Sequence, residues 1–257
     1  MAEGMITREL DRYFRSVLDI EGFSNMDSSM NGLQVDNDGT PVTKIAFAVD
    51  ACLESFKRAR EEGAGLIFVH HGLFWGKAEA LTGVFRKRVK ELLDLNLALY
   101  AAHIPLDQHE ELGNNAALAA KLGITSPEPF GLYHGRKIGY KGKLSSPLTL
   151  DEAAALISHC GAQPSVMLPF GRRINENCAV ISGGAPMEAL QAIDEGIDLY
   201  VTGECSHSVY HAALEGGLNV LCGGHYATEV WGVQKLAVRA AWDLPVETCF
   251  VDLPTGL

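Results

Sequence analysis

The sequence predicts an α/β protein built from two similar α/β domains that arose by internal duplication. Three observations predict this fold class: a strand–helix–strand pattern near the N-terminus, a second copy of it further along, and polar residues at equivalent strand ends. In the first copy, a β-rich run over residues 44–50 precedes a helical stretch over about 53–62, Gly63 and an apolar run over 66–69. Such an apolar run is typical of a parallel strand that is buried on both faces. The first copy therefore predicts a βαβ unit with a right-handed crossover.

The second half of the chain repeats this pattern. A strand and its turn over residues 178–184, a helix over 187–195 and a strand over 198–202 match the first three elements, and Gly196 takes the place of Gly63. Each copy then continues with a further helix and strand, expected over 84–95 and 97–103 in the first copy and over 209–215 and 219–225 in the second. The alternative to a duplication is a chance resemblance, since any two βαβ segments share this order of elements. Here the sequence similarity also includes the polar residues at the strand ends, which favours a duplication.

The segment between the copies, residues 131–177, is richer in Gly, Pro and Ser and holds one predicted helix over 149–160. Thr149 and Glu152 at its start match a capping box. We place the first domain at residues 1–128 and the second at 129–257. The segment after Glu229 could instead pack back on the first domain.

Composition excludes several classes of protein. The 257 residues include 21 basic and 32 acidic side chains, a formal net charge of −11, which argues against nonspecific binding to nucleic acid. No apolar run approaches the roughly 18 residues that cross a bilayer. The segment over residues 1–14 is charged where a signal peptide needs an apolar run. The six cysteines are scattered and predict reduced thiols, so we expect a cytoplasmic protein.

The residues that follow the predicted strands carry the candidate chemistry. The strand ends are followed by His70 and His71, by His103 with Asp107 four residues later, by Glu204, and by His225 with Glu229 four residues later. Because ligands in open α/β sheets collect at the carboxyl ends of strands, these side chains form one candidate site.

Imidazole and carboxylate groups together suit Zn, Mn, Fe or Ni better than Ca or Mg. On a helix, His225 and Glu229 would point from one face toward one ion. The adjacent His70 and His71 could each reach a different ion, which predicts a pair of divalent metal ions bridged by a carboxylate. A single strand-end histidine is more often structural, but four motifs at equivalent ends favour a metal site. His207 and His211 could line it, although an exposed helix face fits them better.

These residues resemble the NIF-three-like family, also called GTP cyclohydrolase I type 2 homologues. The matching segments span most of the chain in the family's order: NGLQV (31–35), VHHGLFW (69–75), HIPLD with ELGNN (103–115), TGECSH (202–207) and GGHYATE (223–229). Gly72 stands where many members have Pro, and Cys205 where many have Ile; neither change touches a candidate ligand.

The resemblance implies that two divalent metal ions are bound by His70, His71, Asp107, His225 and Glu229, with Glu229 bridging. His103 and Glu204 would lie beside the metals and move protons. The resemblance also implies that the metal pair lies in the cleft between the two domains, and that the chain forms a homohexamer.

For function, the resemblance implies a metal-dependent hydrolase of a nucleotide-like small molecule, with GTP ring opening and formate release as the named reaction. Two alternatives stay open: a metal-binding scaffold or interaction protein without catalysis, and a metal-dependent phosphohydrolase. Phe74 and Trp75 could stack a purine, although core positions fit aromatic residues there better. The basic residues could meet a triphosphate, although a solvated helix face fits them better; they are Lys77, Arg86, Lys87 and Arg88.

Overall fold

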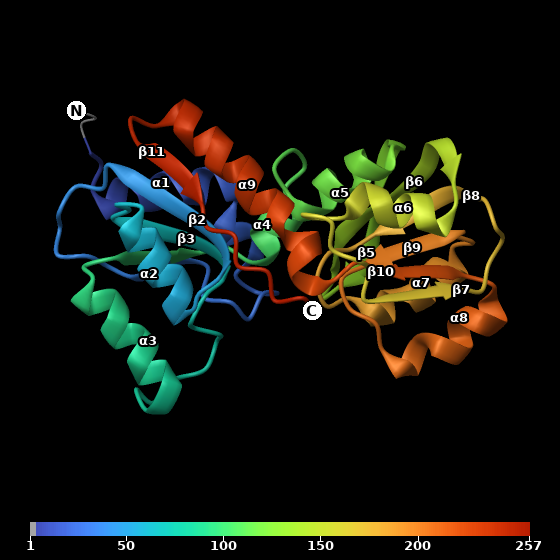
Figure 1. Ribbon diagram of the computed structural model, residues 1–257, viewed down its shortest axis with the longest axis horizontal. Coiled ribbons are helices and arrows are strands. Elements are labelled where there is room, and N and C mark those ends of the chain that lie inside the picture. Colours follow the sequence, from blue (N-terminus) through green and yellow to red (C-terminus); the bar gives the residue numbers. More distant parts are fainter. Residues whose placement is uncertain (1–3) are drawn as a thin grey trace. The chain divides into compact units, whose positions relative to one another are not determined.

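Two sheets organise the chain, and each lies in one of two units of the computed structural model, which describes residues 4–257 (Figure 1). The first unit contains the described residues up to Leu106 together with Val233–Leu253, and the second contains Asp107–Gly232 and Pro254–Leu257. The chain therefore passes from one unit to the other within helix α4 (Ile104–Gln108), back within helix α9 (His225–Asp243), and once more after Leu253. The domain boundary expected at 128/129 divides the sequence copies instead, and it stays a prediction. Residues 1–3 of the charged N-terminal segment lie outside the described residues.

The first sheet has the strand order β1-β4-β3-β2-β11. Its strands are β1 (Gly32–Val35), β2 (Lys44–Asp50), β3 (Leu66–His71), β4 (Ala98–Ala101) and β11 (Glu247–Phe250). Strands β2, β3, β4 and β11 run parallel, and β1 is antiparallel to β4. The C-terminal strand β11 thus extends the sheet that the N-terminal half begins.

Helices cover both faces of this sheet. The ring of Phe14 in α1 (Thr7–Leu18) packs on one face, with its centroid 4.9 Å from that of Phe68 and 5.0 Å from that of Tyr100. The alternate residues, such as Ala46 and Ile67, face the opposite side and pack with Phe56 of α2 (Leu53–Glu61) and with α3 (Gly83–Asp94). Burial on both faces explains why β3 reads as a continuous apolar run.

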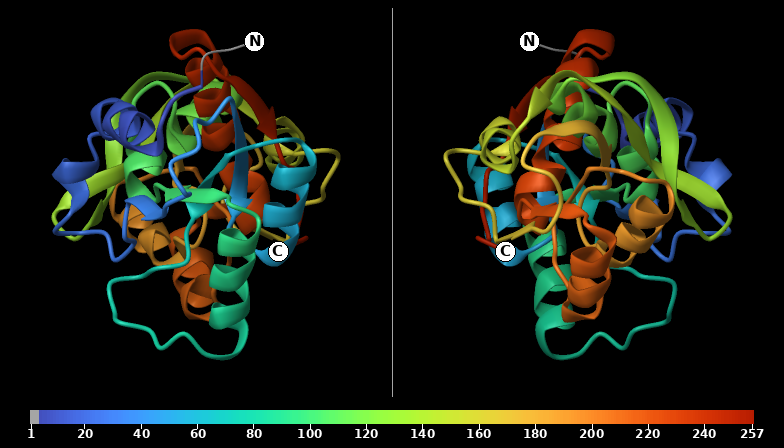
Figure 2. Two further views of the ribbon diagram at one scale, coloured as in Figure 1. Left: turned by 90° about the vertical axis from the view of Figure 1, so that its left-hand side faces the viewer. Right: turned by 90° about the vertical axis from the view of Figure 1, so that its right-hand side faces the viewer.

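The second sheet has the order β5-β6-β8-β9-β10-β7. Its strands are β5 (Ile124–Tyr133), β6 (Arg136–Leu148), β7 (Val166–Pro169), β8 (Asn175–Val180), β9 (Leu199–Thr202) and β10 (Asn219–Cys222). Strands β8, β9 and β10 are parallel, whereas β7 and the β5–β6 ribbon pair antiparallel. Figure 2 shows the ribbon as a long curved pair of strands, which the sequence patterns did not indicate.

Helices also cover both faces of the second sheet. Helices α5 (Asn114–Leu122) and α6 (Leu150–Ile157) lie on one face, and α7 (Ala189–Asp194) and α8 (Tyr210–Gly216) lie on the other (Figure 1). The capping box predicted at α6 is present, with the Thr149 hydroxyl accepting from Glu152 N–H at 3.2 Å. Short 3-10 turns, η2 (Pro186–Glu188) and η3 (His207–Val209), begin the segments that were expected to be continuous helices.

The two units repeat one arrangement, which confirms the predicted fold class. Each has a helix, an antiparallel strand and three adjacent parallel strands joined by two crossover helices. In the first unit the order is α1, β1, β2, α2, β3, α3, β4, and in the second it is α6, β7, β8, α7, β9, α8, β10. A His-x-x-x-acid pattern follows the last strand of each copy: His103 directly precedes α4, which contains Asp107, and His225 begins α9, which contains Glu229. Among the described residues, no helix has the length and apolar character to span a membrane.

Candidate metal centre

Three histidines of the first unit meet at the carboxyl ends of two neighbouring strands. His70 and His71 end β3, and His103 follows β4, which pairs with β3 in parallel. One ring nitrogen from each of the three histidines lies within 4.8 Å of the other two. Parallel strands end at the same sheet edge, so the sequence positions alone bring these rings together.

Each of the three rings is held by its Nδ1 atom. Nδ1 of His70 donates to the carbonyl oxygen of Ala102 at 3.1 Å, and Nδ1 of His71 donates to Oδ1 of Asp50 at 2.8 Å. Nδ1 of His103 donates to Oδ1 of Asp27 at 2.9 Å. Because a carbonyl or carboxylate oxygen accepts the proton on Nδ1, Nε2 is the nitrogen suited to a metal ion. Histidines that bind metals are oriented in this way by carboxylates and backbone carbonyls.

The buried carboxylate of Asp27 organises the segment before β1. Its side chain is 1% exposed and accepts from Ser29 N–H, Asn31 Nδ2, His103 Nδ1 and Ile104 N–H at 2.9–3.0 Å. Burial raises the pKa of Asp27, but the hydrogen bonds and the charge of His103 outweigh it and hold the pKa below its usual value. Asn31 also accepts from the His103 N–H at 2.8 Å. The motif that begins at Asn31 therefore positions His103.

Asp50→Asn is expected to lower the affinity for divalent metal by about 10- to 100-fold, because the amide loses the negative charge that orients His71. The Asp50 side chain is 36% exposed, so the free energy of unfolding should change little. Metal titration by calorimetry and urea unfolding measure the two effects. Asp38→Asn, at an exposed turn of the same unit, is the matched control. Equal affinities in the two variants would contradict a metal-binding role for His71.

Carboxylates dominate the donors of the second unit. His225 and Glu229 lie in the first turns of α9, with His225 Nε2 3.2 Å from Glu229 Oε2. An oxygen of Asp107 lies within 4.8 Å of an oxygen of Glu229. Both carboxylates are buried, since Asp107 is 8% and Glu229 is 2% exposed. Two ionised carboxylates this close repel each other unless a proton or a cation lies between them, and a divalent ion would supply that charge.

The ring of His225 is held like those of the first unit. Its Nδ1 donates to Oε1 of Glu204 at 2.6 Å. Burial lowers the pKa of His225, but the hydrogen bond and charge of Glu229, followed by those of Glu204, outweigh it and raise the pKa to about 9. A cation is therefore favoured at this position, and a metal ion would take the place of the proton on Nε2.

Two asparagines at the start of α5 support Asp107. Oδ1 of Asp107 accepts from Asn114 Nδ2 and from the Ser182 hydroxyl, both at 2.9 Å. Asn114 Oδ1 accepts from Gly232 N–H at 2.6 Å, and Asn115 Oδ1 accepts from Ser182 N–H at 2.7 Å. The Asn-Asn pair of the ELGNN motif thus connects the Asp107 carboxylate to the loop after β8 and to α9.

Gly183 leaves space for the Glu229 carboxylate. A Cβ atom at position 183 would lie 2.1 Å from Glu229 Oε1 and 3.2 Å from His225 Nε2. The φ of Gly183 is +64°, a left-handed conformation that favours glycine. The glycine after β8 is therefore part of the second donor set, although the sequence patterns did not single it out.

The donor chemistry of both units fits divalent metal ions of the Zn, Mn, Fe or Ni type. All seven residues that the sequence singled out as ligands or proton carriers belong to one of the two donor sets. The first unit provides His70, His71 and His103, and the second provides Asp107, Glu204, His225 and Glu229. Asp27 and Asp50, which orient two of the rings, were missed; no spacing pattern links them to the histidines.

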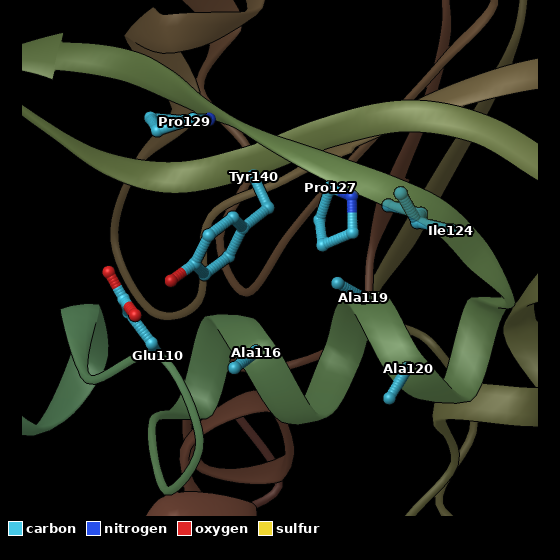
Figure 3. A pocket seen from close by; sticks show the side chains of 8 residues that line it. All are labelled: Glu110, Ala116, Ala119, Ala120, Ile124, Pro127, Pro129 and Tyr140. Atoms are coloured by element: carbon cyan, nitrogen blue, oxygen red, sulfur yellow. The ribbon is translucent and has the colours of Figure 1, made fainter.

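A separate pocket of about 440 Å³ lies in the second unit, and no residue of the donor sets lines it (Figure 3). Its floor is formed by three alanines of α5, and Tyr140 and Glu110 form one end; the lining residues are Glu110, Ala116, Ala119, Ala120, Ile124, Pro127, Pro129 and Tyr140. Burial, followed by the charge of Glu110, raises the pKa of Tyr140. The pocket lacks the cluster of imidazoles and carboxylates that characterises the donor sets.

The fold and the two donor sets together define an α/β protein whose His, Asp and Glu side chains could hold metal ions. The family model for Duf34/NIF3 (NGG1p interacting factor 3) matches residues 5–255, and the chain belongs to this family. This confirms the family resemblance read from the sequence.

Two curated relatives are similar over nearly the whole chain, and both are named "GTP cyclohydrolase 1 type 2 homolog". The relative from Treponema pallidum is 41% identical, covering 98% of this chain and 100% of its own, and that from Archaeoglobus fulgidus is 42% identical, covering 97% and 98%. The solved structure of a protein called ybgI, described as of unknown function, has a TM-score of 0.90 at 34% identity, covering 98% of this chain and 100% of its own.

Proposed function

We propose that the donor sets of both units serve one pair of divalent metal ions, bound by His70, His71, Asp107, His225 and Glu229. The supporting observation is that four imidazoles are each fixed through Nδ1 to an oxygen acceptor, while two buried carboxylates lie within 4.8 Å of each other. His103 of the first set and Asp107 of the second are only four residues apart in the sequence.

We further propose that this centre hydrolyses a nucleotide-like small molecule. A bound metal pair would supply Lewis acidity and lower the pKa of a water molecule. Five protein ligands shared by two ions leave coordination positions for substrate, as in catalytic sites and unlike closed structural ones. The name of the curated relatives supports GTP as the first substrate to test.

Within this proposal, His103 and Glu204 handle protons. Asp27 holds the His103 ring by Nδ1, so Nε2 is directed to the cluster of His70 and His71, where it can accept or deliver a proton. The Glu204 side chain is 53% exposed and bonds to His225 through one oxygen. Its carboxylate can therefore exchange protons with solvent while it orients the ring.

The test is to incubate metal-loaded protein with GTP and a panel of other nucleotides, with formate and phosphate assayed separately. We expect formate from GTP, and its loss in Asp107→Ala by at least about 100-fold, because a buried ligand is removed. Phosphate without formate would favour the phosphohydrolase alternative. No product, with two metal ions still bound per chain, would favour a binding role without catalysis.

Glu247→Gln is the control for this assay. Glu247 is an exposed residue that pairs with Lys44 at the start of β2, at the opposite end of the sheet from the histidines, and its replacement should leave product formation unchanged. If Asp107→Ala and Glu247→Gln released formate at equal rates, Asp107 would have no part in the reaction.

We also propose that the protein is cytoplasmic and that it assembles into a homohexamer. Among the described residues, the six cysteines form no disulfide, as a reducing compartment favours, and this supports the cytoplasm. The homohexamer stays a prediction from the family resemblance, with sedimentation of metal-loaded protein as its test.

A further inference from the structure

The indole of Trp75 lies beside the histidines of the first donor set. Its ring centroid is 5.1 Å from that of His103, in an edge-to-face arrangement, and 6.2 Å from that of His71. The residue is 36% exposed. A large aromatic side chain that remains partly exposed beside polar groups is typical of a binding surface.

The neighbouring Phe74 shows why Trp75 is not simply part of the core. Phe74 packs against the core cluster of the first unit, with its ring 5.2 Å from that of Phe85 in α3. Phe74 is therefore partly buried in the core, whereas the adjacent Trp75 is exposed. Beyond Trp75, residues 76–82 are exposed and form the open loop before α3 seen in Figure 2.

The turn that carries Trp75 is held in place from two sides. Its indole Nε1–H donates to the carbonyl oxygen of Gly72 at 3.0 Å. Gln34 of β1 accepts from Leu73 N–H at 2.7 Å through its Oε1, and Met30 N–H donates to the carbonyl oxygen of Phe74 at 2.9 Å. The indole is therefore fixed before any ligand arrives, which lowers the entropic cost of binding.

Gly72 makes this arrangement possible. A Cβ atom at position 72 would lie 2.4–2.5 Å from the amide atoms of Gln34 and 2.6 Å from Cβ of Ala101. The Gln34 amide thus occupies the space that a side chain at position 72 would need. The NGLQV and VHHGLFW motifs together support Trp75.

We propose that Trp75 is a substrate-binding residue that stacks the planar heterocycle of the substrate next to the histidines of the first donor set. This inference rests on the proposed function and narrows it to substrates that carry a flat ring. Stacking on an aromatic side chain does not depend on the pattern of ring substituents, because every base has a π-face. Specificity among rings must then come from other groups of the site.

The test compares a ligand that has a ring with one that lacks it. Calorimetry measures the affinity of metal-loaded protein for GTP and for inorganic triphosphate. In Trp75→Leu we expect the affinity for GTP to fall by about tenfold or more, the range of single base–aromatic stacks. The affinity for triphosphate and the metal content should stay unchanged. Trp75→Phe should recover most of the GTP affinity.

Trp242→Leu is the matched control, since Trp242 is 88% exposed near the end of α9 and should not affect either ligand. The difference in fluorescence between wild type and Trp75→Leu isolates the emission of Trp75, which a stacked ring should quench. Equal GTP affinity in wild type and Trp75→Leu, or loss of metal from Trp75→Leu, would overturn the stacking role.

If neither GTP nor triphosphate binds while the metal is retained, the nucleotide proposal fails. Titration with flavin mononucleotide and a pterin then decides the stacking role separately. Quenching of Trp75 by either ring supports the inference without a nucleotide substrate, and quenching by none of the three rings overturns it.

Discussion

Glu229→Gln is expected to lower the affinity of the protein for both divalent ions by about 100-fold or more. Glu229 is 2% exposed, and its Oε2 lies 3.2 Å from Nε2 of His225. A neutral amide cannot balance the charge of two cations, and loss of a mere outer partner already weakens metal binding by about 10- to 100-fold. Elemental analysis after dialysis against a weak chelator measures the metal that remains on the protein.

Glu215→Gln, at an exposed position of α8, is the control for this charge change. We expect it to retain as much metal as wild type. Loss of only one ion from Glu229→Gln would contradict the bridging role of Glu229, although it would leave that residue as a ligand of one ion.

Gly183→Ala is expected to have the second largest effect, on stability and on metal binding together. The left-handed backbone at φ +64° costs roughly 1–2 kcal/mol for a residue with a Cβ atom. The new Cβ would also lie 2.1 Å from Glu229 Oε1, so the carboxylate or the loop after β8 must move. We expect the free energy of unfolding to fall by about 2 kcal/mol or more, together with loss of metal. Urea unfolding and elemental analysis measure both effects.

Gly196→Ala separates the two causes. Gly196 has a similar φ of +67°, but within the described part of the chain no atom lies within 4 Å of the Cβ position. Its replacement should therefore reduce stability through the backbone alone and leave metal content unchanged. If Gly183→Ala behaved like Gly196→Ala in both measurements, the close approach of Glu229 to Gly183 would not matter for metal binding.

The parallel strands and the candidate ligands could be predicted because their signals are local. The apolar run ending at His70 and the His-x-x-x-acid pattern at His225 are each visible within a few residues. The second copy of the strand–helix–strand pattern then showed that the candidate ligands follow equivalent strands in both copies. One copy alone would not have indicated that these residues belong to a site.

The rest of the site depends on contacts between distant segments. Asp27 is 76 residues from His103, and Asp50 is 21 residues from His71, so no periodic pattern connects either carboxylate to its ring. The antiparallel β5–β6 ribbon was missed for a different reason. Its residues 125–129 are exposed and include two prolines, so they lack the alternation that indicates a strand.

Crystals grown with Mn²⁺ and measured for anomalous scattering would reveal whether the two donor sets bind one pair of metal ions. We expect two peaks roughly 3.5–4 Å apart, a typical separation for two-metal sites, with Glu229 in contact with both. One peak alone, no peak, or two peaks that each contact the donors of a single unit would contradict it.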